Sequence, residues 1–262
     1  MYEAEKLIKD SMNEFRDAFL NSVDISLQEL ELDQDLIINN YDKFENSLSQ
    51  FKPIIFSTMT KAAKRTEKPR KSIELNLDKE MTLNEANRLT GNLITNINST
   101  QREVIRYIIN DGIENNYSHK VISKKLRTKI GLNFEQIKIL DSMEESLLKN
   151  GTKVSQIEKI INIKSKQMLK LRADTIALTE SARAVSSGRY LIQQQMFDDG
   201  DIDEKSTQKW LTGSDERVCY VCGPMNNTSV GMKDFFISGT GQKIQYPPVH
   251  PRCGCIVIVD FK

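Results

Sequence analysis

The cysteines constrain this chain more than any other residue type, because all four lie after residue 218. Two residues separate Cys219 from Cys222, a spacing that can turn both thiolates toward one metal ion. His250, Cys253 and Cys255 follow some thirty residues later. The sequence therefore predicts a structural zinc site with five candidate ligands, one more than such a site takes. Either all four cysteines bind, or His250 replaces Cys253 or Cys255, and the sequence leaves this choice open.

Three other uses of the cysteines compete with a metal site. Disulfides are disfavoured because the N-terminus, MYEAEKLIKDSMNEF, carries acids where a signal peptide has basic and apolar regions. A thioredoxin-like pair needs a βαβ context, which the irregular segment around Cys219 lacks. Buried free thiols do not explain the clustering. A closed zinc site stabilises folding and leaves no position for water, which argues against metal catalysis.

The residues before 200 have the periodicity of amphipathic helices, with apolar side chains three and four positions apart. Thr82 and Glu85 form a capping-box pattern that predicts a helix start at Thr82. The last long helix is expected to break near Arg172. The predicted helices cover residues 7–20, 36–51, 82–110, 119–130, 134–149 and 154–197.

Beyond residue 200, Gly, Pro, Cys and β-forming residues replace the helical pattern. Residues 238–241, SGTG, suit a hairpin turn, and residues 256–261 suit a strand. We predict an α+β fold, a mainly α-helical body with a small C-terminal zinc-stapled β-rich module. The predicted domains are an N-terminal helical hairpin and basic linker at 1–80, a helical body at 81–200, and the Cys/His module at 201–262.

Charge is distributed unevenly, although the net charge is only +1. Acidic residues dominate positions 1–50, whereas positions 52–71, which include the predicted linker 61–72, are basic. Basic runs can neutralise phosphates, although a solvated helix face is their commoner cause. No apolar run is long enough to span a membrane. The candidate nucleic-acid contacts are Lys61, Lys64, Arg65, Lys68, Arg70, Lys71, Lys124, Lys125 and Arg127.

Four motifs follow one another along the second half of the chain. They are Arg172-x-x-x-Ile176-Ala177-x-Thr179-Glu180, Lys209-Trp210-Leu211-Thr212, Asp215-Glu216-Arg217-Val218-Cys219-x-x-Cys222 and Pro247-Pro248-Val249-His250-Pro251-Arg252-Cys253-Gly254-Cys255. In this order they resemble the phage head morphogenesis family, minor capsid proteins similar to protein F of phage Mu. The resemblance covers about residues 110–258, and its last third is the most specific part. Gly254 departs from the family, which usually has arginine there.

The resemblance implies a structural role in building phage heads rather than an enzymatic one. Members enter the procapsid in few copies and associate with the portal protein, and some bind DNA. The implied partners are the portal, capsid or scaffolding protein, and double-stranded DNA, with no membrane. The implied location is the virion, in the head interior near the portal, with the host cytoplasm during assembly.

Five further residues are expected to support the metal ligands structurally: Arg172, Glu180, Trp210, Asp215 and Arg217. An alternative is a metal-dependent nuclease or other hydrolase with His250 as base and Glu180 or Asp215 as further ligands. The chain has only two histidines, which leaves little for general-base chemistry. A third hypothesis is a host zinc-ribbon protein that binds nucleic acid.

Overall fold

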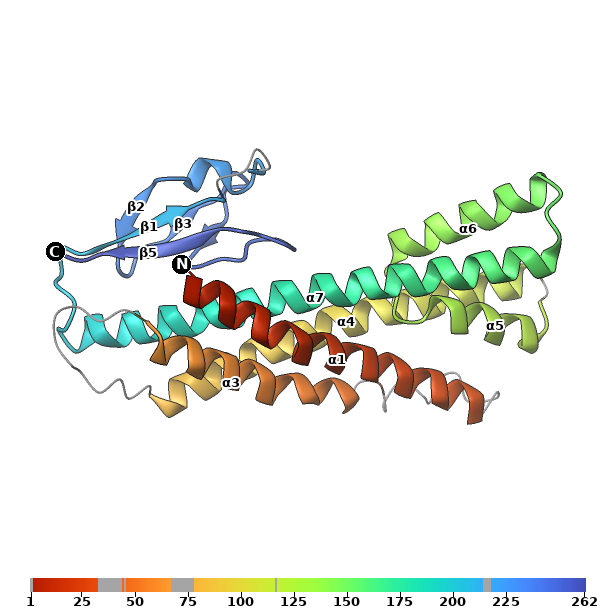
Figure 1. Ribbon diagram of the computed structural model, residues 1–262, viewed down its shortest axis with the longest axis horizontal. Coiled ribbons are helices and arrows are strands. Elements are labelled where there is room, and N and C mark those ends of the chain that lie inside the picture. The colour runs from red at the N-terminus through yellow and green to blue at the C-terminus, as the bar shows by residue number, and fades with distance from the viewer. Residues whose placement is uncertain (1, 33–43, 45, 67–77, 116, 214–217) are drawn as a thin grey trace. The chain divides into compact units, whose positions relative to one another are not determined.

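A computed structural model of the chain describes residues 2–32, 44, 46–66, 78–115, 117–213 and 218–262 (Figure 1). Most of these residues are helical, and short antiparallel strands follow at the C-terminal end of the sequence, which confirms the predicted fold class. None of the helices in these residues combines the length and apolarity needed to cross a bilayer. The long helices are α1 (Tyr2–Leu32), α3 (Phe51–Lys64), α4 (Lys79–Glu114), α5 (His119–Lys129), α6 (Phe134–Lys149) and α7 (Val154–Asp198).

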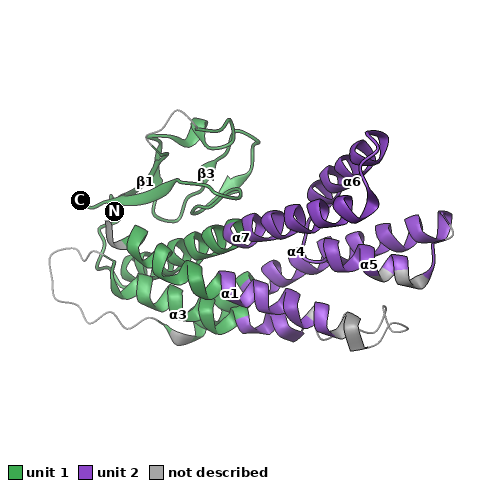
Figure 2. Ribbon diagram, turned by 45° about the vertical axis from the view of Figure 1, so that its right-hand side comes forward, with its two compact units in different colours: residues 1–15, 51–89, 175–262 green, residues 16–50, 90–174 purple. Residues whose placement is uncertain are grey.

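Contacts divide the chain into two compact units (Figure 2). Unit 1 contains residues 1–15, 51–89 and 175–262, and therefore all the strands. Unit 2 contains residues 16–50 and 90–174. The three-part division of the sequence after residues 80 and 200 stays a prediction.

Helix α6 begins where local chemistry predicts. The Asn133 side chain accepts the backbone N–H of Gln136 at 2.9 Å, and the Gln136 side chain accepts the N–H of Asn133 at 3.1 Å. This reciprocal capping satisfies two amides that have no partner inside the helix. The predicted range 134–149 is confirmed.

Helix α4 corrects the capping-box prediction, because it begins at Lys79 rather than at Thr82. The Oδ1 atom of Asp78 accepts the N–H groups of Glu80 and Met81, at 2.8 and 3.2 Å. Asp78 therefore caps the helix, four residues before Thr82. The Glu85 side chain is left to make contacts with other elements.

Two other expectations are also corrected. Helix α7 runs unbroken from Val154 to Asp198, with no interruption at Arg172, and neither Pro nor Gly stands between residues 152 and 187 to break it. The expected linker at 61–72 is helical in its first four residues, because α3 continues to Lys64 and buries Ala62 and Ala63. Residues 67–72 of that linker lie outside the described part of the chain, as does much of the expected helix 36–51.

The core of unit 2 is formed by apolar residues of α4, α5, α6 and α7 at helical spacing. Lys129 is almost fully buried in this unit and pairs with Asp141, which also accepts a hydrogen bond from Tyr107. The largest side chains of this core include Ile108, Leu126, Leu132 and Ile137.

The strands of the C-terminal module form two small antiparallel sheets. Strand β1 (Thr207–Leu211) lies between β2 (Ser229–Gly231) and β5 (Ile256–Asp260), with Thr207 opposite Asp260. Strands β3 (Phe236–Ile237) and β4 (Lys243–Ile244) form the second sheet, as a hairpin around the predicted 238–241 turn.

The module packs on the helices of unit 1. Ile192 and Met196 of α7 share an apolar cluster with Ala63 of α3 and with Met232 and Ile202. Figures 1 and 2 show the strands beside the C-terminal part of α7. The module is therefore anchored by helix side chains on one side while its own interior is built around the cysteines.

Candidate metal centre

The first half of the candidate centre is a tight turn that carries Cys219 and Cys222. The carbonyl of Cys219 accepts the N–H groups of Cys222 and Gly223, at 3.2 and 2.9 Å. The N–H of Gly239, from the β3–β4 hairpin, donates to the carbonyl of Val221 at 2.8 Å. A Cβ at Gly239 would lie 2.1 Å from the Tyr220 carbonyl oxygen, so this approach of the hairpin to the turn requires glycine.

The second half is the loop between β4 and β5. The N–H of Cys253 donates to the carbonyl of His250 at 3.2 Å, which turns the chain so that both side chains project toward the first half. Arg252 lies inside this turn with a φ of 58°, in the left-handed region that residues other than glycine seldom adopt.

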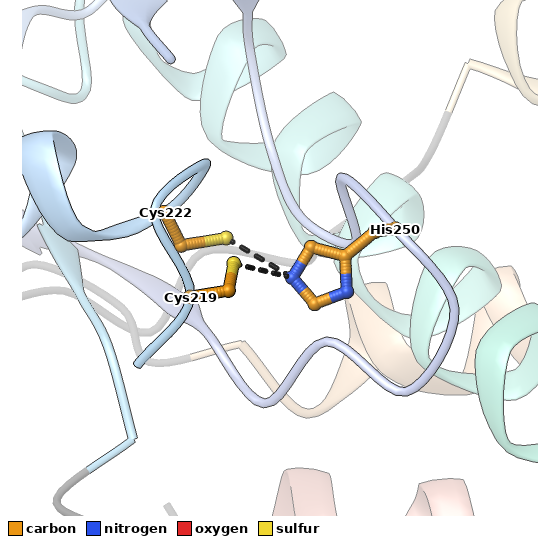
Figure 3. Close-up of side chains that lie close together, drawn as sticks. All are labelled: Cys219, Cys222 and His250. Atoms are coloured by element: carbon orange, nitrogen blue, oxygen red, sulfur yellow. Dashed lines mark hydrogen bonds between the residues drawn. The ribbon is translucent and has the colours of Figure 1, made fainter. Parts of the chain in front are cut away.

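The two halves bring the donor atoms together (Figure 3). The Nε2 atom of His250 lies 3.1 Å from the sulfur of Cys219 and 3.4 Å from that of Cys222. The sulfurs of Cys222 and Cys253 are 3.9 Å apart. Two triads have all their ligand atoms within 4.8 Å of one another, and Cys222 belongs to both. They are Cys219, Cys222 and His250, and Cys222, Cys253 and Cys255.

These separations fit a tetrahedral metal ion. Metal–sulfur bonds of about 2.3 Å and metal–nitrogen bonds of about 2.0 Å give edges of about 3.8 Å between sulfurs and about 3.5 Å between sulfur and nitrogen. The three printed distances differ from these edges by less than about 0.5 Å. The donor set of thiols and an imidazole suits a soft or borderline divalent cation.

The histidine is oriented as a metal ligand. Its Nδ1 atom lies 2.9 Å from the carbonyl oxygen of Pro251. Because a carbonyl oxygen can only accept, Nδ1 carries the proton in this hydrogen bond, and the neutral ring then has its lone pair at Nε2. Nε2 is the atom that faces the sulfurs of Cys219 and Cys222 (Figure 3).

The thiols differ in how readily they ionise. A hydrogen bond with Cys255 is the main reason that the pKa of Cys253 falls to about 5, and the same contact raises the pKa of Cys255. Burial raises the pKa of Cys222 to about 12. Burial also disfavours the Cys219 thiolate, but hydrogen bonds from Cys222 and from the backbone of Val221 outweigh it and lower its pKa. Each half therefore supplies one cysteine with a stabilised thiolate, and a cation would ionise the others as it binds.

Trp210 closes the centre from the β1 side. It is fully buried, packs edge-on against Phe236 at 5.2 Å between ring centroids, and belongs to the same cluster as Cys222 and Cys253. Its Nε1 makes no close hydrogen bond with the described residues. The indole lowers the pKa of Cys255, but the contact with Cys253 and burial raise that pKa by more. The predicted supporting place of Trp210 is thus beside the cysteines.

A hollow of about 360 Å³ opens beside the donor atoms. Its lining combines ligand atoms with backbone and side chains of both halves, which leaves room for an ion next to the sulfurs. The lining residues are Thr212, Gly213, Val218, Cys219, Cys222, His250, Arg252, Gly254 and Cys255.

Residues 137–258 match the family described as Phage Mu protein F like protein. This segment of the chain belongs to the phage Mu protein F-like family. No curated protein and no solved structure matches the chain. Membership suggests a protein of phage head morphogenesis, since the Mu F-like family consists in general of structural head proteins.

The Mu F-like segment begins in α6 and ends in β5, so it contains all five donors and both halves of the centre. The helices α1, α3 and α4 precede it. The matched segment therefore contains both halves of the candidate metal centre and all of helix α7.

Of the other residues expected to support the ligands, two lie in the described part of the chain and contact groups other than the cysteines. Glu180 is buried on α7 and binds Arg183 of the same helix with both carboxylate oxygens, at 2.7 and 2.9 Å. Burial raises the pKa of Glu180 despite this pair. Arg172, in unit 2, donates to the carbonyl of Gly131 at 3.0 Å, and burial lowers its pKa to about 10. Asp215 and Arg217 lie outside the described residues.

The candidate nucleic-acid contacts fall into two groups. Lys61, Lys64 and Arg65 are exposed at the end of α3. On α5, Lys124 pairs with Glu158 at 2.5 Å, and Lys125 pairs with Asp111 at 2.8 Å. Arg127 of α5 also has a partner. Lys68, Arg70 and Lys71 lie outside the described residues.

Sequence reasoning missed a polar network that joins the module to two helices. The carboxylate of Glu85 on α4 accepts hydrogen bonds from Arg88, from Tyr246 of the module and from Ser187 of α7. Gln245 donates to the hydroxyl of Tyr190 on α7 at 2.9 Å. The sequence pattern does not predict these contacts, because Ser187 and Tyr246 lie 102 and 161 positions from Glu85, and only the fold brings them together.

Proposed function

We propose that the chain is a minor structural protein of a phage head, and that its Cys/His cluster holds one structural zinc ion. The observation that carries the proposal is the convergence of the family's two cysteine motifs on one point, within the segment that matches the Mu F-like family. In this proposal the protein acts in head morphogenesis, through contacts with the portal and with capsid or scaffolding protein, in the head interior.

Zinc is the cation that the donor set favours, because thiolates and imidazole bind it in a closed tetrahedron. We assign four donors: Cys219, Cys222, His250 and Cys253. The 3.9 Å separation of Cys253 from Cys222 matches a tetrahedral edge. Cys255 is then a hydrogen-bonding neighbour of Cys253. A small module with few large apolar residues gains stability from such an ion.

The residues that a hydrolase would need already contact other groups of the protein, which supports a structural role. The nuclease alternative uses Glu180 as a metal ligand, but both of its carboxylate oxygens bind Arg183. The same alternative uses His250 as a base, but its Nδ1 faces a carbonyl and its Nε2 faces sulfurs. We therefore expect no metal-dependent cleavage of DNA by the purified protein.

A protein partner with a basic surface fits the exposed side of α1. Carboxylates are exposed along this helix and would attract such a surface at long range. We propose that this helix contacts the portal. The exposed acidic residues are Glu5, Asp10, Glu14, Asp17 and Asp24.

The proposed function is tested in purified particles of the phage that encodes the chain. We expect peptides of this protein in procapsids and in mature heads, at a few copies per portal, and loss of infectious particles when its gene is interrupted. Quantitative mass spectrometry of procapsids, heads and separated tails measures the copy number. Absence from both procapsids and heads overturns the proposal.

Contact with double-stranded DNA is a separate part of the proposal and is tested by salt dependence. Each phosphate contact contributes about 0.9 to the slope of log K against log salt concentration. Replacing Lys61 and Lys64 by Gln should therefore lower the slope by about 1.8. Lys6→Gln/Lys9→Gln is the matched control, because these two exposed lysines lie among the carboxylates of α1 and are not candidate DNA contacts. Binding that does not depend on salt, or no binding, removes DNA from the proposal.

A further inference from the structure

The loop that carries His250 and Cys253 is hydrogen-bonded to helix α7 through Arg252. The backbone N–H of Arg252 donates to the Oγ1 atom of Thr179 at 3.2 Å. The Nε atom of Arg252 donates to the Oγ1 atom of Thr175 at 3.0 Å. Because the two threonines are four residues apart, they lie on one face of the helix and receive both donors of the same residue.

The hydroxyl of Thr179 is oriented to accept a hydrogen bond from Arg252. It donates its own proton to the carbonyl of Thr175 at 2.7 Å, in the usual manner of a helical threonine. Its lone pairs are therefore available to the N–H of Arg252. This N–H belongs to a residue with a φ of 58°, a backbone conformation that the surroundings must hold in place.

Arg252 stands between two of the proposed ligands, so its hydrogen bonds to the two threonines also affect those ligands. His250 and Cys253 flank it in the sequence, and the Cys253 N–H closes the turn on the His250 carbonyl. Fixing the backbone at Arg252 therefore fixes the directions in which the imidazole and the thiolate leave the turn. Residues that orient metal ligands in this way typically change metal affinity by about 10- to 100-fold when they are removed.

We infer that Thr175 and Thr179 are positioning residues of the metal centre. They hold the turn of residues 250–253 against α7, so that His250 and Cys253 face Cys219 and Cys222 before the ion arrives. By linkage, the bound ion in turn fastens the module to α7. The inference rests on the proposed zinc site and goes beyond it, because neither threonine is a ligand.

The test compares the zinc affinity of the wild-type protein with that of Thr175→Val/Thr179→Val, by competition with a chromogenic chelator. Valine keeps the branched shape and removes the hydroxyl. We expect zinc binding to weaken about 10-fold or more. The visible spectrum of the cobalt-substituted variant should keep its shape, because the four ligands are unchanged.

Thr100→Val is the matched control. Thr100 of α4 also donates to the carbonyl four residues earlier, that of Asn96 at 2.9 Å, and it belongs to unit 2, whereas the proposed ligands belong to unit 1. This substitution should leave zinc affinity unchanged. Thr179→Ser, which keeps the hydroxyl, should bind zinc like the wild type and separates the lost hydrogen bond from a packing change.

The outcomes distinguish this inference from the proposal beneath it. A wild-type protein that binds no zinc overturns both. A zinc-binding wild type with an unchanged affinity in the double variant overturns the inference alone. Far-UV circular dichroism reports whether each variant is folded. If the double variant is unfolded, Thr179→Val compared with Thr179→Ser decides, with equal affinities overturning the inference.

Discussion

At the scale of single residues, Cys222 connects the two halves of the candidate metal centre. Its sulfur belongs to both triads, and it is buried beside Trp210 and Cys253. Cys255 reaches the second triad only. The cysteines should therefore contribute unequally to metal binding, although they are alike in the sequence.

Single substitutions test this ranking. We expect Cys222→Ser to abolish stoichiometric zinc binding, because it removes the donor that lies within reach of all the others. Cys255→Ser should retain one zinc per chain, since four donors remain. Native mass spectrometry of both variants measures the stoichiometry. Loss of zinc in Cys255→Ser, with retention in His250→Ala, would show instead that the four cysteines are the ligands.

The half-buried carboxylate of Glu85 gives a second prediction at this scale. Burial favours its neutral form, but hydrogen bonds from Arg88 and Tyr246 outweigh this and hold its pKa below the ordinary value of 4.5. A carboxyl with a lowered pKa stabilises the folded state above its unfolded pKa and loses that contribution as pH falls through the folded value. Glu85→Gln should therefore cost about 1–3 kcal/mol of unfolding free energy at pH 7.

The difference between Glu85→Gln and wild type should shrink below about pH 4.5. Urea unfolding of both proteins at several pH values measures it, and comparing the two at each pH cancels any metal loss that they share. A difference that is constant from pH 7 down to pH 3 would show that the charge of Glu85 contributes nothing.

At the scale of secondary-structure elements, two helical glycines differ in what surrounds them. A Cβ at Gly188 of α7 would lie 2.2 Å from the carbonyl oxygen of Met59 on α3. Backbone atoms at this distance cannot move aside cheaply, so glycine allows the two helices to approach closely. A Cβ at Gly91 of α4 would meet no atom within 4 Å.

Alanine at these two positions should therefore act in opposite directions. Gly91→Ala should raise the unfolding free energy by about 0.5–1 kcal/mol, because alanine has the higher helix propensity. Gly188→Ala should lower it by about 1–3 kcal/mol, because the helices must separate. Denaturant unfolding compares the two variants with wild type. A stabilising Gly188→Ala would contradict the close packing of α3 and α7.

At the scale of the whole molecule, we expect the proposed zinc site and the helices to stabilise different parts. The module is built around Trp210, the cysteines and short strands, whereas the helices bury their own apolar faces. Removing the ion should therefore disorder the module and leave most of the helical structure in place.

Chelation tests this division. Trp210 is the only tryptophan of the chain, so its fluorescence reports on the module. A strong chelator should shift the emission to longer wavelength, while the helical circular dichroism signal at 222 nm falls only slightly. Addition of zinc should reverse the shift. Simultaneous loss of both signals would show that the helices depend on the ion.

The sequence by itself predicted the helical character of most residues before 200, the strand at the C-terminal end, and the Cys and His residues that could bind a metal. Apolar periodicity encodes the first, and cysteine clustering encodes the last, because ligand chemistry requires those residue types. The predicted start of α4 was wrong because Asp78, and not Thr82, caps the helix. A local sequence pattern does not show which of two possible capping residues is used.

Only the tertiary structure decided how the donors meet and what holds them. Cys222 became the shared donor because two turns distant in sequence converge, and Thr175 and Thr179 became neighbours of Arg252 because the module packs on α7. Glu85 came to contact Tyr246 in the same way. Such contacts depend on how the whole chain folds, and residue types alone do not show which distant segments will meet.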